Sequence, residues 1–348
     1  MRDSDTAVDS WQQDGGRTVK ELRVGLVGAG TIAGAHLPAW HALGAQVSAF
    51  SLEGAAELTD RHGGSVVTSF EELMERCDVI DVCTPTPVHR HYAEAALLAG
   101  RDVVAEKPLA RTGDDAVLLA RVAAETGRHL YPAHVVRFFP AYATMAEAVR
   151  AGRIGRPAVL RLTRTSAFPM WREWFADPAQ SGGVVMDLMI HDLDIARWVA
   201  GDVTDVYATL AQGEEDGLPI AMAHAVLTHA GGAISHVRGV WGAPSTTFST
   251  SFHVAGDGGV LTYDSRDARA LTLDVGTGSG GGRLPDISLG ESPYLTQLRE
   301  FAGAIAGGPV PRVSAADGVA AVELALAALT SIETGDSVRL PAAGGGAR

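Results

Sequence analysis

The first part of the chain alternates short apolar runs with amphipathic stretches. Strand-like runs occupy residues 22–27, 46–51, 65–68, 78–84, 102–105 and 129–133. Between them the sequence has helical spacing, as at Ile32, His36 and Trp40, which lie four residues apart and so share one helix face. Repeated alternation of strand and helix predicts a doubly wound parallel sheet with helices on both faces.

The pattern changes after about residue 138. Strand-like runs then follow one another at 158–165, 205–211, 221–228, 232–240, 248–255, 258–263 and 270–275. One long helical stretch, 187–200, interrupts them, and two more, 292–306 and 315–330, close the chain. Consecutive strands predict an α+β domain with an open, mainly antiparallel sheet. We therefore expect a flexible extension (1–20), an α/β domain (21–138), an α+β domain (139–341) and a flexible tail (342–348).

Composition narrows the class of protein. A length of 348 residues suits two domains, and 46% hydrophobic with 20% charged residues excludes a disordered chain. A net charge of −13 without a basic patch argues against nucleic-acid binding. The chain has no continuous apolar run of 18 residues and no apolar core near its start, so we expect neither a membrane span nor a signal peptide. Two cysteines, Cys77 and Cys83, cannot build a disulfide framework and are typical of the reducing cytoplasm.

A glycine-rich turn follows the first strand. The segment VGLVGAGTIAG places Gly28, Gly30 and Ala33 in a G-x-G-x-x-A pattern, with Thr31 and Ile32 between them. In such a turn the first glycine permits the bend, the second lets the backbone approach a pyrophosphate, and the small third residue packs helix against strand. An ordinary flexible turn is the alternative. The position between a strand and a helix favours a dinucleotide, either NAD or NADP.

The second strand ends in the residue that should contact the adenosine ribose. A carboxylate there would repel a 2′-phosphate and select NAD. This chain has Ser51, followed by Leu52 and Glu53, and the nearest base, Arg61, comes a helix later. Serine repels no phosphate, no base follows to bind one, and Glu53 favours NAD slightly.

Longer motifs resemble the glucose–fructose oxidoreductase/inositol dehydrogenase/MocA family. The segment CTPTPVHRHYAEAALLAGRDVVAEKPLA (residues 83–110) is similar to that family's T-P-N-x-x-H turn and its E-K-P motif, with Thr86 in place of Asn. SGGVVMDLMIHDLDIARWVAG (181–201) resembles its G-G-x-x-x-D-x-G-x-H-x-x-D helix, with Met189 in place of Gly. HVVRFFPAY (134–142) and the closing segments are also similar, so the resemblance runs from about residue 22 to 341.

The resemblance implies an NAD(P)-dependent oxidoreductase acting on a hydroxyl of a sugar, inositol or related polyol. It implies a cis Lys107–Pro108 bond, and a homodimer or homotetramer, which the broad sheet face also suggests. The residues we then expect to bind the cofactor are Gly28, Gly30, Thr31, Ile32, Ala33, Ser51, Thr84, Pro85, Thr86, His89, Glu106 and Lys107.

Three residues are the candidates for catalysis. Asp187 and His191 are four residues apart on a predicted helix, so both project from one face. His191 suits the base that takes a hydroxyl proton, and Asp187 or Lys107 suits the group that orients it. A solvated acid–histidine pair is the alternative, but the apolar flanks predict a mostly buried helix, where ionisable groups need a partner or a function. Lys107 should lie at the carboxyl edge of the parallel sheet, where ligands bind.

The remaining candidates are less specific. Trp171 and Trp174 could wall a sugar ring, although a loop folded onto the core uses tryptophan equally well. Asp194 lies near the face of His191 and could also contact substrate. His89 has no carboxylate at metal-ligand spacing, so we expect no metal. Two other functions stay open: a glycosidase that uses bound NAD transiently, and a non-catalytic dinucleotide sensor.

Overall fold

The computed structural model of the protein describes residues 22–170, 173–215, 218–267, 272–275 and 291–341. The expected extension (1–20) and tail (342–348) lie outside these residues. Chain contacts divide the protein into two units, and each is considered by itself. The first comprises Met1–Ala110, Asp114–Val135 and Gly290–Val319, and the second comprises Arg111–Gly113, Val136–Leu289 and Ala320–Arg348.

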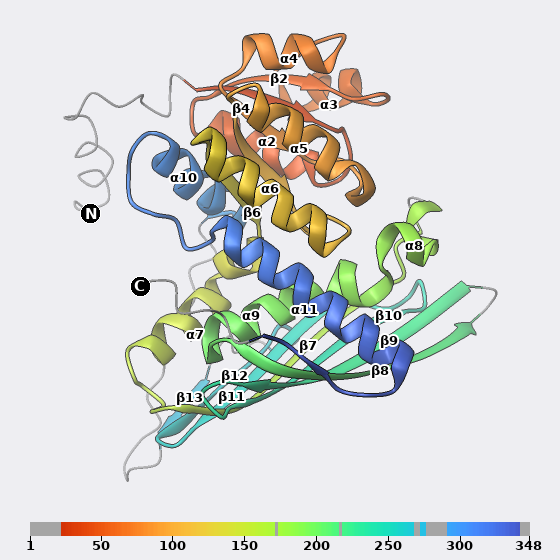
Figure 1. The fold of residues 1–348 in the computed structure, drawn as a ribbon, viewed down its shortest axis with the longest axis vertical. Coiled ribbons are helices and arrows are strands. Elements are labelled where there is room, and N and C mark those ends of the chain that lie inside the picture. The colour runs from red at the N-terminus through yellow and green to blue at the C-terminus, as the bar shows by residue number, and fades with distance from the viewer. Residues whose placement is uncertain (1–21, 171–172, 216–217, 268–271, 276–290, 342–348) are drawn as a thin grey trace. The chain divides into compact units, whose positions relative to one another are not determined.

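The first unit contains a parallel sheet of six strands in the order β3-β2-β1-β4-β5-β6. Figure 1 shows this sheet among the helices α2 to α6. This order, with helices between successive strands, confirms the predicted doubly wound α/β fold. Its strands are β1 (Arg23–Val27), β2 (Gln46–Phe50), β3 (Ser65–Val66), β4 (Val79–Val82), β5 (Asp102–Glu106) and β6 (Leu130–Ala133). Its helices are α2 (Ala33–Ala42), α3 (Ala55–His62), α4 (Phe70–Arg76), α5 (His89–Leu98), α6 (Gly113–Thr126) and α10 (Pro293–Ile305), with a short 3₁₀ turn at Thr86–Val88. A second 3₁₀ turn, Val135–Phe138, begins at the last residue of this stretch and belongs mostly to the second unit.

The start of helix α4 is explained by the sequence around Ser69. Ser69 precedes the helix, and its side chain accepts a hydrogen bond from the backbone N–H of Glu72. The Glu72 carboxylate in turn accepts from the backbone N–H of Thr68 at 2.9 Å. Ser69 thus caps the helix and satisfies one backbone donor of its first turn, while Glu72 binds the residue that precedes the cap.

Helix α10 returns to the first unit from the far end of the chain. It packs on α2, Leu298 and Phe301 on it are fully buried, and the Phe301 ring stacks on Tyr131 of β6 at 4.9 Å. The sequence places residues 292–306 in the second domain, whereas contacts group them with the first. An amphipathic helix has one apolar face, and its pattern does not say which apolar surface that face will cover.

The second unit contains an eight-stranded sheet in the order β13-β12-β11-β7-β10-β9-β8-β14. Among the described strand pairs of this sheet only β7–β10 is parallel, which confirms the expected mainly antiparallel sheet. The strands are β7 (Pro157–Ala167), β8 (Val203–Glu215), β9 (Leu218–His229), β10 (Ile234–Gly242), β11 (Ser249–Gly256), β12 (Gly259–Asp264), β13 (Thr272–Val275) and β14 (Val338–Arg339). The helices are α7 (Pro140–Arg150), α8 (Pro178–Ser181), α9 (Ile190–Ala200) and α11 (Ala315–Thr334), with a 3₁₀ turn at Glu173–Ala176 and a π-helical turn at Val185–Met189.

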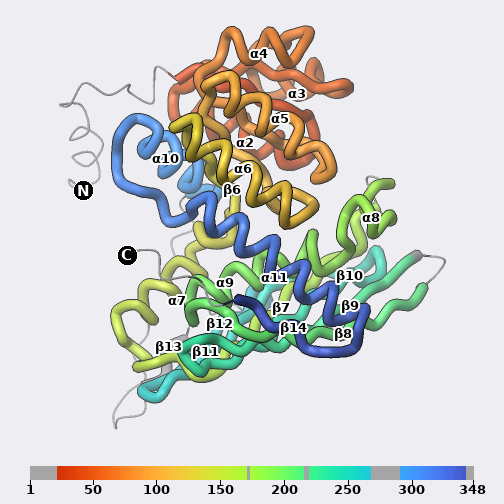
Figure 2. The backbone as a smooth tube through the Cα atoms, viewed as in Figure 1, coloured from red at the N-terminus to blue at the C-terminus, as the bar shows by residue number. Residues whose placement is uncertain are grey.

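Helices cover one face of this sheet. Figure 2 shows α7 and α9 on the same side, and α9 contacts both β7 and β10. Along β7 the side chains of Leu160 and Leu162 are buried, while Arg161 and Thr163 alternate with them on the other face. On β7 the second face of the sheet therefore carries polar side chains.

Helix α11 is long and apolar. It spans 20 residues with a mean hydropathy of 1.6, so by length and composition alone it could cross a membrane, although Asp317 and Glu323 interrupt its apolar run. In the structure it is packed: Val322 and Ala325 are fully buried, and 44% of the apolar window is buried. A single helix of this length and composition is weak evidence for a membrane span, because core helices of soluble proteins share both properties.

Candidate functional site

The glycine-rich turn has the conformation that a dinucleotide requires. Gly28 has φ +103°, and a Cβ there would lie 2.5 Å from the carbonyl oxygen of Cys83, so the position admits glycine alone. Gly30 differs, because a Cβ there would meet no atom within 4 Å. Gly28 thus makes the close turn, and Gly30 faces open space that a pyrophosphate can fill.

The amino end of α2 follows directly. No side chain caps this helix, and the backbone N–H groups of Gly34 and Ala35 donate to the carbonyl oxygens of Gly30 and Ile32. The partial positive charge at the amino end of the helix still suits an anion. Ala33 is fully buried and lets the helix approach the strand, Thr31 is exposed and Ile32 half-buried. These residues fit the phosphate cradle that the sequence predicts.

The ribose-reading position lies directly after β2. Ser51 is half-buried, Leu52 is 90% exposed and Glu53 is exposed. The first residue after the strand therefore offers a hydroxyl, and the nearest carboxylate, that of Glu53, comes two residues later. The choice between NAD and NADP therefore stays a prediction.

The turn after β4 carries a second expected contact. Thr84 is half-buried, and its Oγ1 is buried without a hydrogen-bond partner among the described residues. An unpaired buried hydroxyl at the carboxyl edge of the sheet is suited to a polar ligand atom. Pro85 is exposed, whereas Thr86 is buried.

His89 has a supporting place. Its Nδ1 lies 2.8 Å from the carbonyl oxygen of Pro108, and its Nε2 lies 2.8 Å from that of Thr84. Burial lowers the pKa of His89, and the hydrogen bonds to the two carbonyls oppose that shift. Both ring nitrogens contact backbone carbonyls, so His89 joins two turns and supports the cofactor site in place of the direct cofactor contact that we expected.

Glu106 and Lys107 end β5, and the Lys107–Pro108 bond is cis, as the resemblance implied. Glu106 is 6% exposed, and its Oε2 accepts a hydrogen bond from the backbone N–H of Lys107 at 3.1 Å. Lys107 is half-buried at the carboxyl edge of the sheet. The first unit thus gathers the glycine turn, Thr84 and Lys107 at one sheet edge, because carboxyl ends of parallel strands lie together.

In the second unit Asp187 and His191 lie on the helix that covers the sheet. Both are partly exposed, whereas Met186, Leu188 and Ile190 are buried. Asp187 belongs to the π-helical turn, which the sequence did not predict. A turn of π-helix contains slightly more than four residues, so residues four apart still lie near one side of the helix. Turns of this kind often occur at functional sites.

Two buried ion pairs fix that helix, and the sequence reasoning missed both. Arg137 binds Asp194 with contacts of 2.8 and 2.6 Å, and Arg164 of β7 binds Asp192 with contacts of 2.8 and 3.1 Å. Asp194 is only 2% exposed, so its carboxylate has a structural role in place of the substrate contact we expected. The signal was present: two arginines in apolar segments, which need buried acids as partners.

The aromatic candidates can be placed only in part. Trp171 lies outside the described residues. Trp174 is half-buried and stacks on Phe175 at 4.1 Å, and Phe175 lies edge-on to Trp241. Trp174 therefore belongs to an aromatic cluster of the second unit. Such a cluster is compatible with contact to a sugar ring and with packing inside the protein.

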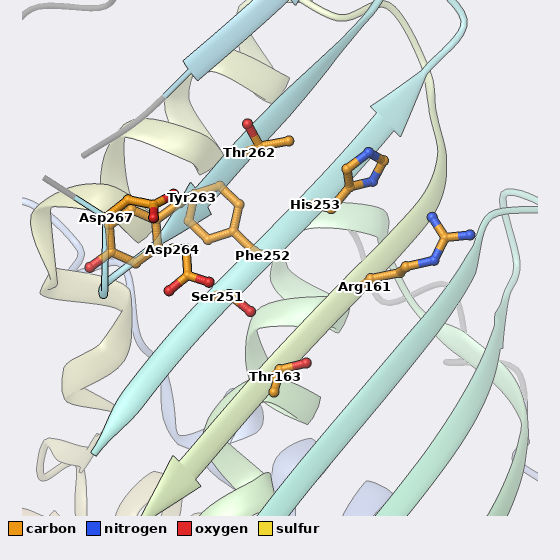
Figure 3. A pocket seen from close by; sticks show the side chains of 9 residues that line it. All are labelled: Arg161, Thr163, Ser251, Phe252, His253, Thr262, Tyr263, Asp264 and Asp267. Carbon is orange, nitrogen blue, oxygen red and sulfur yellow. The ribbon is translucent and has the colours of Figure 1, made fainter. Parts of the chain in front are cut away.

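A hollow of about 370 Å³ lies on the polar face of the second sheet. Figure 3 shows Arg161, Thr163 and Ser251 in its lining. Strand alternation puts these side chains on the face opposite to α9. The hollow is thus separate from Asp187 and His191, and we give it no part in the chemistry.

Comparison with known proteins agrees with the fold of both units. A family model described as an oxidoreductase family with an NAD-binding Rossmann fold matches residues 22–134, and the GFO/IDH/MocA C-terminal domain matches 142–262. The chain is 31% identical over 341 residues to 1,5-anhydro-D-fructose reductase of Ensifer adhaerens, covering 91% of this chain and 98% of the relative. It is 30% identical to myo-inositol 2-dehydrogenase of Thermotoga maritima, over 77% of this chain and 82% of the relative. The fold is similar to that of a levoglucosan dehydrogenase in complex with NADH and L-sorbose, with a TM-score of 0.81 and 23% identity over 92% and 99% of the two chains.

Gly30→Val should abolish dinucleotide binding in a protein that still folds. The branched side chain would enter the open space that the pyrophosphate needs, and its Cβ would meet no protein atom within 4 Å. Fluorescence titration with NADH and NADPH measures the affinity, and circular dichroism checks the fold. Gly303→Val is the matched control, because a Cβ at Gly303 also meets no atom within 4 Å. Unchanged affinity in folded Gly30→Val protein would show that the phosphate site is elsewhere.

Ser51→Asp should shift the affinity ratio toward NAD by about tenfold, or roughly 1.4 kcal/mol. The new carboxylate would accept the ribose hydroxyls and repel a 2′-phosphate. The same titration with both cofactors measures the ratio. Gln46→Glu adds a charge at the exposed start of the same strand and should leave the ratio unchanged. A constant ratio in Ser51→Asp would move ribose recognition to Glu53.

Proposed function

Because the chain belongs to the GFO/IDH/MocA family of oxidoreductases, we propose that it transfers a hydride between a nicotinamide cofactor and the hydroxyl-bearing carbon of a sugar, inositol or related polyol. The relatives support the substrate class: one is a 1,5-anhydro-D-fructose reductase, and two others are inositol dehydrogenases. They agree on the class of compound and differ in the compound itself.

One observation carries the assignment of the catalytic base. Asp187 and His191 are partly exposed on a helix whose neighbouring side chains are buried. A histidine is the side chain whose ordinary titration range suits proton transfer near neutral pH. His191 is therefore the group that takes the hydroxyl proton during oxidation and returns it during reduction.

The other residues have binding and orienting roles. When bound, the nicotinamide accepts or donates the hydride. Gly28 and Gly30 leave room for the phosphates, Lys107 donates a hydrogen bond toward the reacting hydroxyl, and Asp187 stabilises the protonated form of His191. The chain thus supplies position and proton transfer for chemistry that belongs to the cofactor.

Absorbance at 340 nm with a panel of sugars and inositols, each with NAD and with NADP, tests the function. A dehydrogenase accumulates reduced cofactor in proportion to the substrate oxidised. A glycosidase that recycles its NAD would release product without net reduction, and a sensor would do neither. Either of those results would overturn the proposal.

His191→Ala should reduce kcat by roughly 10²–10⁴-fold while the affinity for the dinucleotide stays nearly constant. In the wild type, kcat/KM for oxidation should rise through the range in which histidines titrate, about pH 6 to 8. Asp187→Asn should move this rise to lower pH, because the anion that stabilises the imidazolium is lost. Steady-state kinetics over that range measures both effects.

His91→Ala is the control, since His91 is exposed on α5. It should keep the wild-type rate and pH profile. Near-wild-type turnover in His191→Ala would show that Lys107 or another group is the base.

The open sheet face supports a homodimer or homotetramer. Tyr207, Met222 and Ile234 are between 40% and 45% exposed, and strand alternation puts them on the face away from α9. Sedimentation equilibrium should give a mass of two or four chains, and Met222→Lys should lower it. A wild-type monomer at micromolar concentration would contradict this proposal.

A further inference from the structure

A buried histidine links three elements of the first unit. His36 on α2 is fully buried, and its Nδ1 lies 2.8 Å from Oδ2 of Asp81 on β4. Its Nε2 lies 3.3 Å from Oε1 of Glu106 at the end of β5. Trp40, one turn further along α2, donates its indole N–H to the same Oδ2 at 2.7 Å. The imidazole is therefore held between two carboxylates.

This arrangement suits an imidazolium. Ionised carboxylates only accept hydrogen bonds, and a neutral imidazole can donate from one nitrogen, whereas the charged ring donates from both. The contact with Glu106 is at ion-pair distance but is not aligned as a hydrogen bond. Two buried negative charges nevertheless need a positive one nearby, and His36 lies between them.

The groups around His36 favour its protonated form. Burial lowers the pKa of His36, but the charge of Asp81 and the other neighbours outweigh burial, so its pKa lies well above the ordinary value. Cys83 lies 3.5 Å from Nδ1, and burial raises the pKa of that thiol to about 12, so it stays neutral. From α10, the Tyr294 ring lies 5.8 Å from the imidazole ring. His36 is thus the group expected to change charge as the pH rises above neutral.

The ligand atoms of His36, Asp81 and Cys83 lie within 4.8 Å of one another, a spacing that could also hold a metal ion. The 2.8 Å separation of Nδ1 and Oδ2 is the length of a direct hydrogen bond. A proton therefore explains the geometry without an ion, and the experiment below tests both.

Glu106 connects this cluster to the sheet edge. Its Oε2 accepts the backbone N–H of Lys107, while its Oε1 is buried and accepts no hydrogen bond within the described residues. A buried carboxylate oxygen normally accepts a hydrogen bond, and none of the described residues donates one to Oε1 of Glu106. The hydroxyls of a dinucleotide ribose are donors of the right kind at this edge.

We propose that His36 is a positioning residue of the cofactor site, which orients the Glu106 carboxylate to accept a hydroxyl of the bound dinucleotide. This inference rests on the proposed function. Loss of the His36 proton would leave Asp81 and Glu106 without their shared positive charge. Dinucleotide affinity should therefore be constant near neutral pH and fall on the alkaline side.

The experiment is NADH binding by fluorescence from pH 6 to 10, which needs no turnover. In the wild type the dissociation constant should rise by about tenfold or more at the alkaline end. His36→Gln should bind about tenfold more weakly at pH 7, with a flattened pH curve. Glu106→Gln, which keeps His36, should lose the alkaline change as well, and this holds even if His36→Gln fails to fold.

Controls separate the explanations. His91→Gln should reproduce the wild-type curve, and the double variant His36→Gln/Glu106→Gln should bind no more weakly than the worse single variant, because the two residues act through one contact. A wild-type curve in folded His36→Gln, or in Glu106→Gln, would overturn this inference alone. A curve altered by EDTA would replace the proton with a metal ion. Absence of any NADH or NADPH binding in the wild type would overturn the cofactor site together with it.

Discussion

Parallel pairing of β1, β4 and β5 is the constraint on which the candidate site of the first unit depends. The register pairs Val27 with Val82, and Val82 with Ala105, so the three strands end level with one another. The glycine turn, the Thr84 turn and Glu106 follow those ends and are brought together although they are far apart in the sequence. The same level ends force Gly28 against the backbone of Cys83, and they put Asp81 and Glu106 within reach of one histidine on α2.

In the second unit, buried ion pairs fix the helix that covers the sheet. Its covering helix places Asp192 and Asp194 inward, where an isolated carboxylate would be costly. Each acid has an arginine in two-point contact, one from β7 and one from the turn before α7. Planar two-point contacts fix rotation as well as distance. Residues of the same helix that stay partly exposed, such as His191, therefore have a defined direction.

The sequence predicted most strands of both units and the helices α9, α10 and α11 to within a few residues, because period-two and period-3.6 patterns depend on burial that every residue in an element shares. It did not predict α7, α8 or β14. Glycine chemistry also predicted the turn at Gly28. Tertiary partners were not predictable in this way. Whether Asp194 meets a substrate or Arg137, whether His89 faces a ligand or two carbonyls, and which surface α10 covers depend on residues distant in the sequence. Asp81 was the readable signal that went unused, since a carboxylate within the apolar run Val79–Val82 must have a buried partner.

The return of residues 290–319 to the first unit has a consequence for how the protein is made. The surface of α2 that α10 covers stays bare while the ribosome translates the whole intervening unit, because the helix that completes it is synthesised last but one. Vectorial folding from the amino end, the usual order for consecutive domains, is therefore interrupted here. Until α10 is synthesised, the first unit lacks the helix that covers α2. Because its segments lie on both sides of the second unit in the sequence, no single proteolytic cut releases the first unit complete. Evolution by exchange of whole domains is constrained in the same way, since a donor of this unit must supply two separate stretches of gene.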